Sequence, residues 1–150
     1  MIIKERKLPI HFLQLEALWR RLPEHHPKCE EIADDIKKQK TGYKGEQSVD
    51  YQLTFLMTEK YMILHDIRLF DGSHYFQLDT LILSSKFLLF LEVKNIFGTL
   101  IFDSEFHQLI RVTDEKREGF PDPILQMDRQ KRQLCKWLGL NIPVESLGLQ

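Results

Sequence analysis

The order of the predicted elements in this 150-residue chain indicates an α/β (α+β) fold, with a mixed central sheet flanked by helices. Two observations support this prediction. Residues 10–22 place apolar side chains at steps of three and four, which is typical of an amphipathic helix, whereas residues 61–94 hold three strand-like runs separated by turns. Hydrophobic residues make up 43% of the chain, which is enough for the core of one domain.

Helices are expected through the first third of the chain. Pro23 ends the first of them, and residues 23–27 form a linker. Residues 30–40 begin with two glutamates and end with lysines, the charge order that a helix macrodipole favours, and Gly42 is placed to cap this second helix. We therefore expect a helical N-terminal arm over residues 1–41 and a main domain over residues 42–150.

The main domain is expected to run from a helix into strands and back to a helix. Its first helix spans residues 43–58, and its last helix, residues 123–138, is opened by Pro123 and followed by Gly139. Strands are predicted at 61–67, 75–83, 87–94, 99–102, 107–112 and 141–150, with a charged loop at 114–122. No closing signal follows the last strand, so we allow for a truncated C-terminus.

Charge and cysteine content exclude several classes of protein. The 21 basic and 22 acidic residues give a net charge of -1, so only a local patch can attract nucleic acid. Cys29 and Cys135 stand outside any CxxC pattern, which argues against a zinc site and fits a reducing compartment. The chain shows no secretory signal and no apolar run long enough to span a bilayer. We expect a soluble, cytoplasmic protein with no membrane partner.

The strongest chemical signal is Glu92-Val93-Lys94, at the end of the apolar run 87–91. Unpaired charges are costly in a buried strand, so these groups either neutralise one another or bind a ligand. If strands 75–83 and 87–94 form a hairpin around Ser85-Lys86, Asp79 pairs with Glu92, with their Cβ atoms about 5 Å apart. A three-residue loop would place the two acids on opposite faces. The even loop is inferred from the acids, since Ser-Lys is not a favoured turn pair.

Glu46 would join these two acids if its helix packs on the face that they share. On that helix Glu46, Val49, Asp50 and Leu53 fall on one side. Three carboxylates without a counter-charge raise one another's pKa values, and Mg²⁺ or Mn²⁺ would relieve the repulsion, because hard cations take carboxylate oxygens. Lys94 would then face a phosphate group. The alternative is that Lys94 and Glu92 form a solvated pair on an edge strand.

These residues, in this order, resemble the PD-(D/E)xK nuclease superfamily, and more closely its nuclease-related domain, often called NERD. The matching stretches are 42–46 (GYKGE), 76–83 (FQLDTLIL), 91–95 (LEVKN) and 123–126 (PILQ). The resemblance covers about residues 42–138. It implies a restriction-endonuclease-like core and a phosphodiesterase site that uses Mg²⁺ or Mn²⁺.

The resemblance also implies a role for each site residue. Asp79 and Glu92 would bind the metal ion together with the carbonyl of Val93. Glu46 would hold a second ion or a metal-bound water. Lys94 would polarise the attacking water or stabilise the charged phosphorane.

Gln126, at the start of the last helix, would orient a water or a backbone phosphate; the alternative is that it only caps or solvates that helix. Some branches of the superfamily carry Gln-x-x-x-Tyr here, whereas this chain has Gln130 in place of the tyrosine. Leu78, in place of the usual proline, precedes the first acid.

Basic residues on the last helix are the best candidates for contacts with a phosphate backbone, although such a cluster is more often a solvated face. Contacts of this kind position a duplex without reading its sequence, so we expect DNA to be bound with little sequence specificity. The candidate residues are Arg129, Lys131, Arg132 and Lys136, together with Lys44 near Glu46.

Three functions remain open at this point. The first is a metal-dependent nuclease that hydrolyses DNA phosphodiester bonds in DNA processing or repair. The second is a nucleic-acid-binding module with the nuclease fold and no useful turnover, which the near-neutral charge and the missing tyrosine favour. The third is a structural or interaction domain whose arm, residues 1–40, docks a partner or a second copy to give a homodimer.

Overall fold

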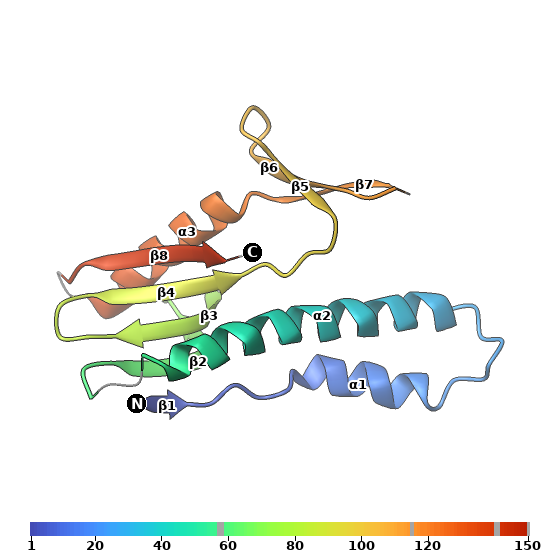
Figure 1. Cartoon of the computed structure of the whole chain (residues 1–150), viewed down its shortest axis with the longest axis horizontal. Helices are drawn as coiled ribbons and strands as arrows, with labels where there is room; N and C mark the ends of the chain where they lie inside the picture. The colour runs from blue at the N-terminus through green and yellow to red at the C-terminus, as the bar shows by residue number, and fades with distance from the viewer. Residues whose placement is uncertain (57–58, 115, 140–141, 150) are drawn as a thin grey trace.

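The computed structural model describes residues 1–56, 59–114, 116–139 and 142–149. These residues form a mixed main sheet, a smaller second sheet and three helices (Figure 1), which confirms the predicted fold class. In chain order the elements are β1 (Ile2–Lys4), α1 (Ile10–Trp19), α2 (Cys29–Thr54), β2 (Met62–Phe70), β3 (Tyr75–Leu83), β4 (Leu88–Val93), β5 (Thr99–Asp103), β6 (Gln108–Val112), β7 (Arg117–Pro121), α3 (Pro123–Leu138) and β8 (Val144–Leu149).

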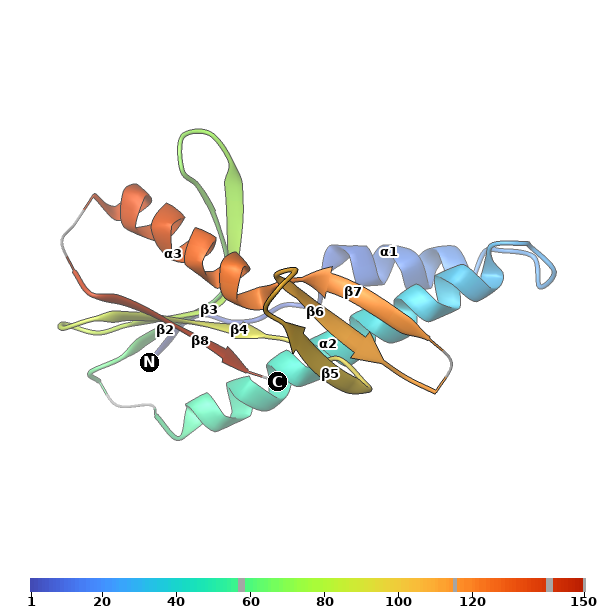
Figure 2. The same cartoon turned by 90° about the horizontal axis from the view of Figure 1, so that it is seen from above.

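The main sheet has the strand order β1-β2-β3-β4-β8. β1 is parallel to β2 and β8 is parallel to β4, whereas β2, β3 and β4 are antiparallel neighbours. Helices α2 and α3 lie on opposite faces of this sheet (Figure 2). Leu134 of α3 packs with Phe90 on one face, and Leu53 of α2 packs with Ile82 and Leu91 on the other. Burial on both faces explains why residues 81–83 of β3 and 88–91 of β4 are continuous apolar runs.

The outer half of the β2–β3 hairpin bends out of the sheet toward the side of α3 (Figure 2). The pairing of β2 with β3 is interrupted between His65–Thr80 and Ile67–Leu78, where regular pairing would join Asp66 to Asp79. Asp66 has a left-handed φ of 52° at this point. Leu78 and Leu81 pack in the same core beneath α3, although strict alternation would put them on opposite faces. Asp79 therefore lies at the bend of β3.

The N-terminal third differs from the prediction in two respects. Residues 29–54 form one continuous helix, so the predicted helix end at Gly42 is wrong, and the boundary expected after residue 41 falls inside α2. A glycine inside a helix costs about 1 kcal/mol relative to alanine, which tertiary packing outweighs. Gly45 serves that packing, because a Cβ atom there would lie 2.4 Å from the Cβ of Asn95. The arm also contains a strand, β1, that was not predicted.

Helix α1 packs along α2 and buries Phe12 and Leu15 (Figure 1). It ends at Trp19, three residues before the predicted limit. At the other end of the chain, α3 begins and ends as predicted: the Asp122 side chain accepts the N–H of Ile124 at 2.8 Å, and Gly139 closes the helix with a φ of 60°. None of the helices in the described part of the chain has the length and apolar character needed to cross a bilayer.

Strands β5, β6 and β7 form a separate antiparallel sheet that projects from the main sheet (Figures 1 and 2). The predicted hairpin β5–β6 is confirmed. The prediction of a loop over 114–122 is wrong for Arg117–Pro121, which form β7. Arg111 and Glu118 face each other across β6 and β7 as an ion pair, and such opposite charges stabilise strand pairing. Residue 115 lies outside the described residues. The same holds for 57–58 of the predicted helix 43–58 and for 141 and 150 of the predicted strand 141–150.

Candidate active site

The hairpin between β3 and β4 has a loop with an even number of residues, as predicted from the placement of Asp79 and Glu92 on one face. Leu81 pairs with Phe90, and the N–H of Ser84 donates to the carbonyl of Phe87 at 3.0 Å. The Ser84 hydroxyl oxygen also accepts the N–H groups of Lys86 and Phe87. This local hydrogen bonding explains how the chain turns here without a favoured turn pair. The predicted register is confirmed from Leu83–Leu88 to Thr80–Leu91, and the predicted pair Asp79–Glu92 lies one residue beyond the regular pairing.

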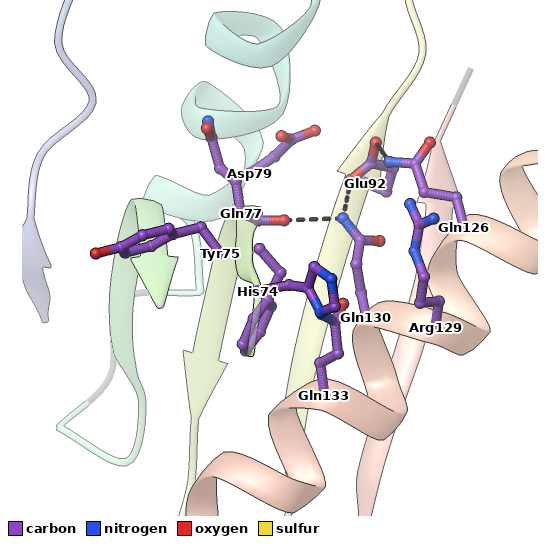
Figure 3. Close-up of a pocket in the computed structure, with 10 residues that line it drawn as sticks. His74, Tyr75, Gln77, Asp79, Glu92, Gln126, Arg129, Gln130 and Gln133 are labelled. Carbon is purple, nitrogen blue, oxygen red and sulfur yellow. Dashed lines mark hydrogen bonds between the residues drawn. The ribbon is translucent and has the colours of Figure 1, made fainter. Parts of the chain in front are cut away.

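Asp79 and Glu92 lie at the open end of this hairpin and line one pocket of about 620 Å³ (Figure 3). The Asp79 carboxylate accepts the N–H of Val93 at 3.0 Å. Burial, followed by the nearby charge of Glu92, raises the pKa of Asp79 to about 6. The pair Thr80–Leu91 is the last regular pair of the two strands, so Asp79 and Glu92 follow it at the same end of the hairpin, and the charge of Glu92 adds to the rise in the Asp79 pKa.

Glu92 is only 4% exposed and is surrounded by hydrogen-bond donors. Its Oε1 accepts from Lys94 Nζ at 2.6 Å. Oε1 also accepts from Gln126 Nε2 at 2.6 Å, and Oε2 accepts from Gln130 Nε2 at 3.4 Å (Figure 3). The ammonium group and the amides replace the water that a buried carboxylate has lost. The structure thus brings together four of the predicted site residues: Asp79, Glu92, Lys94 and Gln126.

Gln130 is a contact of Glu92 to which the sequence assigned no role. Its Nε2 also donates to the carbonyl of Gln77 at 2.8 Å, which ties α3 to β3 (Figure 3). Its Oε1 is buried and has no hydrogen-bond partner within the described part of the chain. The sequence spacing could have revealed this contact, because residues four apart on a helix share a face and Gln126 was already predicted to face the site.

Glu46 approaches from the other side of the sheet. The prediction that its helix covers the face shared by Asp79 and Glu92 is wrong, because Leu53 packs α2 against the opposite face and α3 takes the shared one. Glu46 is still near Asp79: burial raises the pKa of Glu46 to about 7, Arg6 opposes this shift, and the charge of Asp79 adds to it.

Arg6, in the segment between β1 and α1, is the neighbour of the site that the sequence did not reveal. Its side chain is 3% exposed, and Nη1 donates to Glu46 at 2.8 Å. The stretch Lys4 to Lys7 reads as an ordinary charged terminus, and only the fold shows that one of its side chains is buried. The other groups that accept from Arg6 are the carboxylates of Asp50 and Asp66, the carbonyl of Asp79 and the hydroxyl of Thr80.

A family model, described as the nuclease-related domain, matches residues 41–149. The chain belongs to the nuclease-related domain family. A comparison with curated proteins found no match, and neither did a comparison with solved structures. The matched region includes Glu46, Asp79, Glu92, Lys94 and Gln126, whereas Arg6 lies before it.

The donors of this nuclease-related domain fit one hard cation. Asp79 and Glu92 offer carboxylate oxygens, and a cation would relieve the repulsion that raises the Asp79 pKa. The unpartnered Oε1 of Gln130 is a further buried oxygen next to Glu92. Among the described residues, no group of three or more His, Cys, Asp or Glu side chains is arranged to hold a metal ion, so main-chain oxygens or water would complete the coordination.

The predicted phosphate-binding residues of the nuclease-related domain are dispersed. Arg129 lines the pocket beside Gln126 (Figure 3). Arg132 and Lys136 are exposed on α3, and Lys131 pairs with Glu145 of β8 at 3.2 Å. Lys44 lies elsewhere, because it lines a separate groove of about 210 Å³ where α1 packs on α2. The structure therefore places one of the five basic residues directly at the pocket.

Proposed function

We propose that this nuclease-related domain hydrolyses DNA phosphodiester bonds with Mg²⁺ or Mn²⁺ held by Asp79, Glu92 and the main-chain carbonyl of Val93. The observation that carries the proposal is the pair of repelling carboxylates, Asp79 and Glu92, in one pocket. A bound cation supplies a Lewis acid that activates water and neutralises phosphate charge.

The surrounding side chains have defined tasks in this proposal. Lys94 is 29% exposed, so its ammonium group can contact Glu92 and also reach a phosphate at the pocket. There it polarises the attacking water or stabilises the negative charge of the transition state. Gln126 orients the water or a phosphate oxygen through its amide. Glu46, through the oxygen that Arg6 does not bind, orients a water beside Asp79 or holds a second ion.

We propose DNA as the substrate, bound through its backbone with little sequence specificity. Arg129 at the pocket makes the first phosphate contact, and Arg132 and Lys136 extend it along α3. The free thiols of Cys29 and Cys135 fit a reducing compartment, so we place the activity in the cytoplasm, in DNA processing or repair.

A cleavage assay tests this proposal. Purified protein is incubated with single-stranded, nicked and branched DNA in Mg²⁺, in Mn²⁺ and in EDTA. We expect cleavage with either ion, loss of cleavage in D79A and K94A variants whose circular dichroism is unchanged, and full cleavage by D34A, which removes an exposed acid of α2. If no DNA is cut with either ion at high protein concentration, the nuclease proposal is wrong.

A nucleic-acid-binding module without turnover is the second candidate. The observation in its favour is that Glu92 already has three donors, one of them a lysine, and does not need a metal ion as counter-charge. DNA binding that weakens with salt and survives D79A, with no cleavage by the wild type, would support this candidate.

A protein-interaction domain is the third candidate. Helix α1 keeps apolar side chains on its outer face: Ile10 is 73% exposed and Leu13 is 46% exposed. Such a face suits a second copy of the chain, giving a homodimer through the N-terminal arm. Light scattering of the wild type and of I10D measures this directly, and a monomer in both cases argues against it.

A further inference from the structure

The segment before the family-matched region contributes a buried cation to the site. The Arg6 guanidinium has five N–H donors. Nε donates to Asp50 at 2.7 Å, and Nη1 donates to Glu46 and to Asp66, both at 2.8 Å. Nη2 donates to Asp50 at 3.1 Å and also reaches the Asp79 carbonyl at 3.1 Å. All five N–H donors of Arg6 thus have acceptors, which belong to three carboxylates and one main-chain carbonyl.

The charges around Arg6 show why a cation is needed there. Three carboxylates, those of Glu46, Asp50 and Asp66, face one guanidinium. Lys4 adds a second positive group beside Asp66, because its Nζ donates to the carbonyls of His65 and Asp66. Removing Arg6 would leave partly buried carboxylates without their main partner, which is strongly unfavourable.

We infer that Arg6 takes the place of a second divalent ion: it is the resident cation on the Glu46 side of the site, and the metal site is a single one at Asp79 and Glu92. The inference rests on the proposed function, which supplies the single ion. Of the two roles proposed for Glu46, it selects the orientation of a water over the binding of a second ion. With Nη1 bonded to one oxygen of Glu46 and Nη2 bonded to the Asp79 main chain, Arg6 occupies the space between these two residues. Glu46 is then a ligand of Arg6, and its free oxygen is left for water.

The first test is Mn²⁺ binding by calorimetry. We expect the wild type to bind one Mn²⁺, D79N to lose it, and E46Q to keep one Mn²⁺ with affinity within about threefold, because the amide oxygen still accepts from Arg6. If the wild type binds two ions and E46Q binds one, the inference is wrong. It is also wrong if E46Q loses about tenfold or more in affinity, because even an outer partner of the metal ligands produces a loss of that size.

The second test needs no metal, so it stays valid if the wild type binds no Mn²⁺ and the proposed function fails. In EDTA, we expect R6M to lower the Tm by roughly 10 °C, since it leaves buried carboxylates unpaired. R6K should recover part of this loss, and R21M, which removes an exposed arginine of the same arm, should change nothing.

The double variant R6M/E46Q separates a counter-charge from simple packing. We expect it to melt at a higher temperature than R6M, because one uncompensated carboxylate is gone, and E46Q should raise the Tm less in the wild type, where Arg6 partners that carboxylate. If E46Q has the same effect with and without Arg6, the two residues are not coupled and the inference is overturned. If R6M does not fold, R6K against R6K/E46Q gives the same comparison with the charge retained and its geometry lost.

Discussion

Replacing Asp79 by asparagine is expected to stabilise the metal-free protein at pH 8. Burial and the charge of Glu92 raise the pKa of Asp79 from 3.8 to about 6, and each pKa unit corresponds to about 1.4 kcal/mol. The ionised carboxylate therefore costs the folded state about 3 kcal/mol at pH 8. Asparagine carries no charge and keeps an oxygen for the Val93 N–H, so D79N should raise the free energy of unfolding by about 1–3 kcal/mol.

The gain in stability should depend on pH in one direction. Because the pKa of Asp79 is higher in the folded than in the unfolded chain, the cost of ionisation is full above about pH 6 and nearly gone below about pH 4. Urea denaturation in EDTA at pH 8 and pH 4 measures this for the wild type, D79N and D128N, which removes an exposed acid of α3. A D79N protein no more stable than wild type at pH 8, or equally stabilised at pH 4, would refute the reasoning.

Three further outcomes follow from the same geometry. K94M should lower the DNA cleavage rate by about 10²–10³-fold while Mn²⁺ affinity by calorimetry stays equal or improves, because a nearby positive charge is gone; a large loss of Mn²⁺ affinity would contradict this. Q126L removes a 2.6 Å hydrogen bond to Glu92 and should weaken Mn²⁺ binding by about 10–100-fold, with no effect expected if Gln126 only caps α3. R129A should weaken DNA binding for all sequences and reduce the slope of log affinity against log salt by about one, whereas K44A, in the groove between α1 and α2, should match wild type.

The β3–β4 hairpin was predictable because a single requirement fixed it. Two acids in apolar strands can meet only in one register, and that register sets the loop length. The structure has this register, together with a Ser84 turn that the sequence did not signal. The start and end of α3 were predictable for a similar reason, since Asp122-Pro123 and Gly139 each have a specific backbone preference.

Elements that depend on tertiary partners were not predictable from the sequence. The helix break at Gly42 was expected from propensity alone, yet α2 continues through it, because α1 packs along α2 and Leu53 packs on the sheet. The strand β7 depends on the cross-strand partner of Glu118, Arg111, which lies seven residues away in sequence. Charge patterns alone made this segment look like a loop.

The face covered by each helix was the main error in the site. Periodicity showed that Glu46 and Leu53 share one side of α2, but not which side of the sheet that helix covers. The role of Arg6 could not be predicted for a similar reason, because 40 residues separate it from Glu46. Only the parallel pairing of β1 with β2 brings the segment that holds Arg6 beside the site. A local pattern cannot encode a contact of this kind.

The most direct test of the central claim is a crystal structure of the protein soaked in Mn²⁺, with anomalous differences recorded at the manganese edge. We predict one strong anomalous peak bonded to carboxylate oxygens of both Asp79 and Glu92, and none between Glu46 and Asp50, where Arg6 lies. A peak elsewhere, or no peak in the pocket at saturating Mn²⁺, would contradict a metal-dependent site built on these two acids.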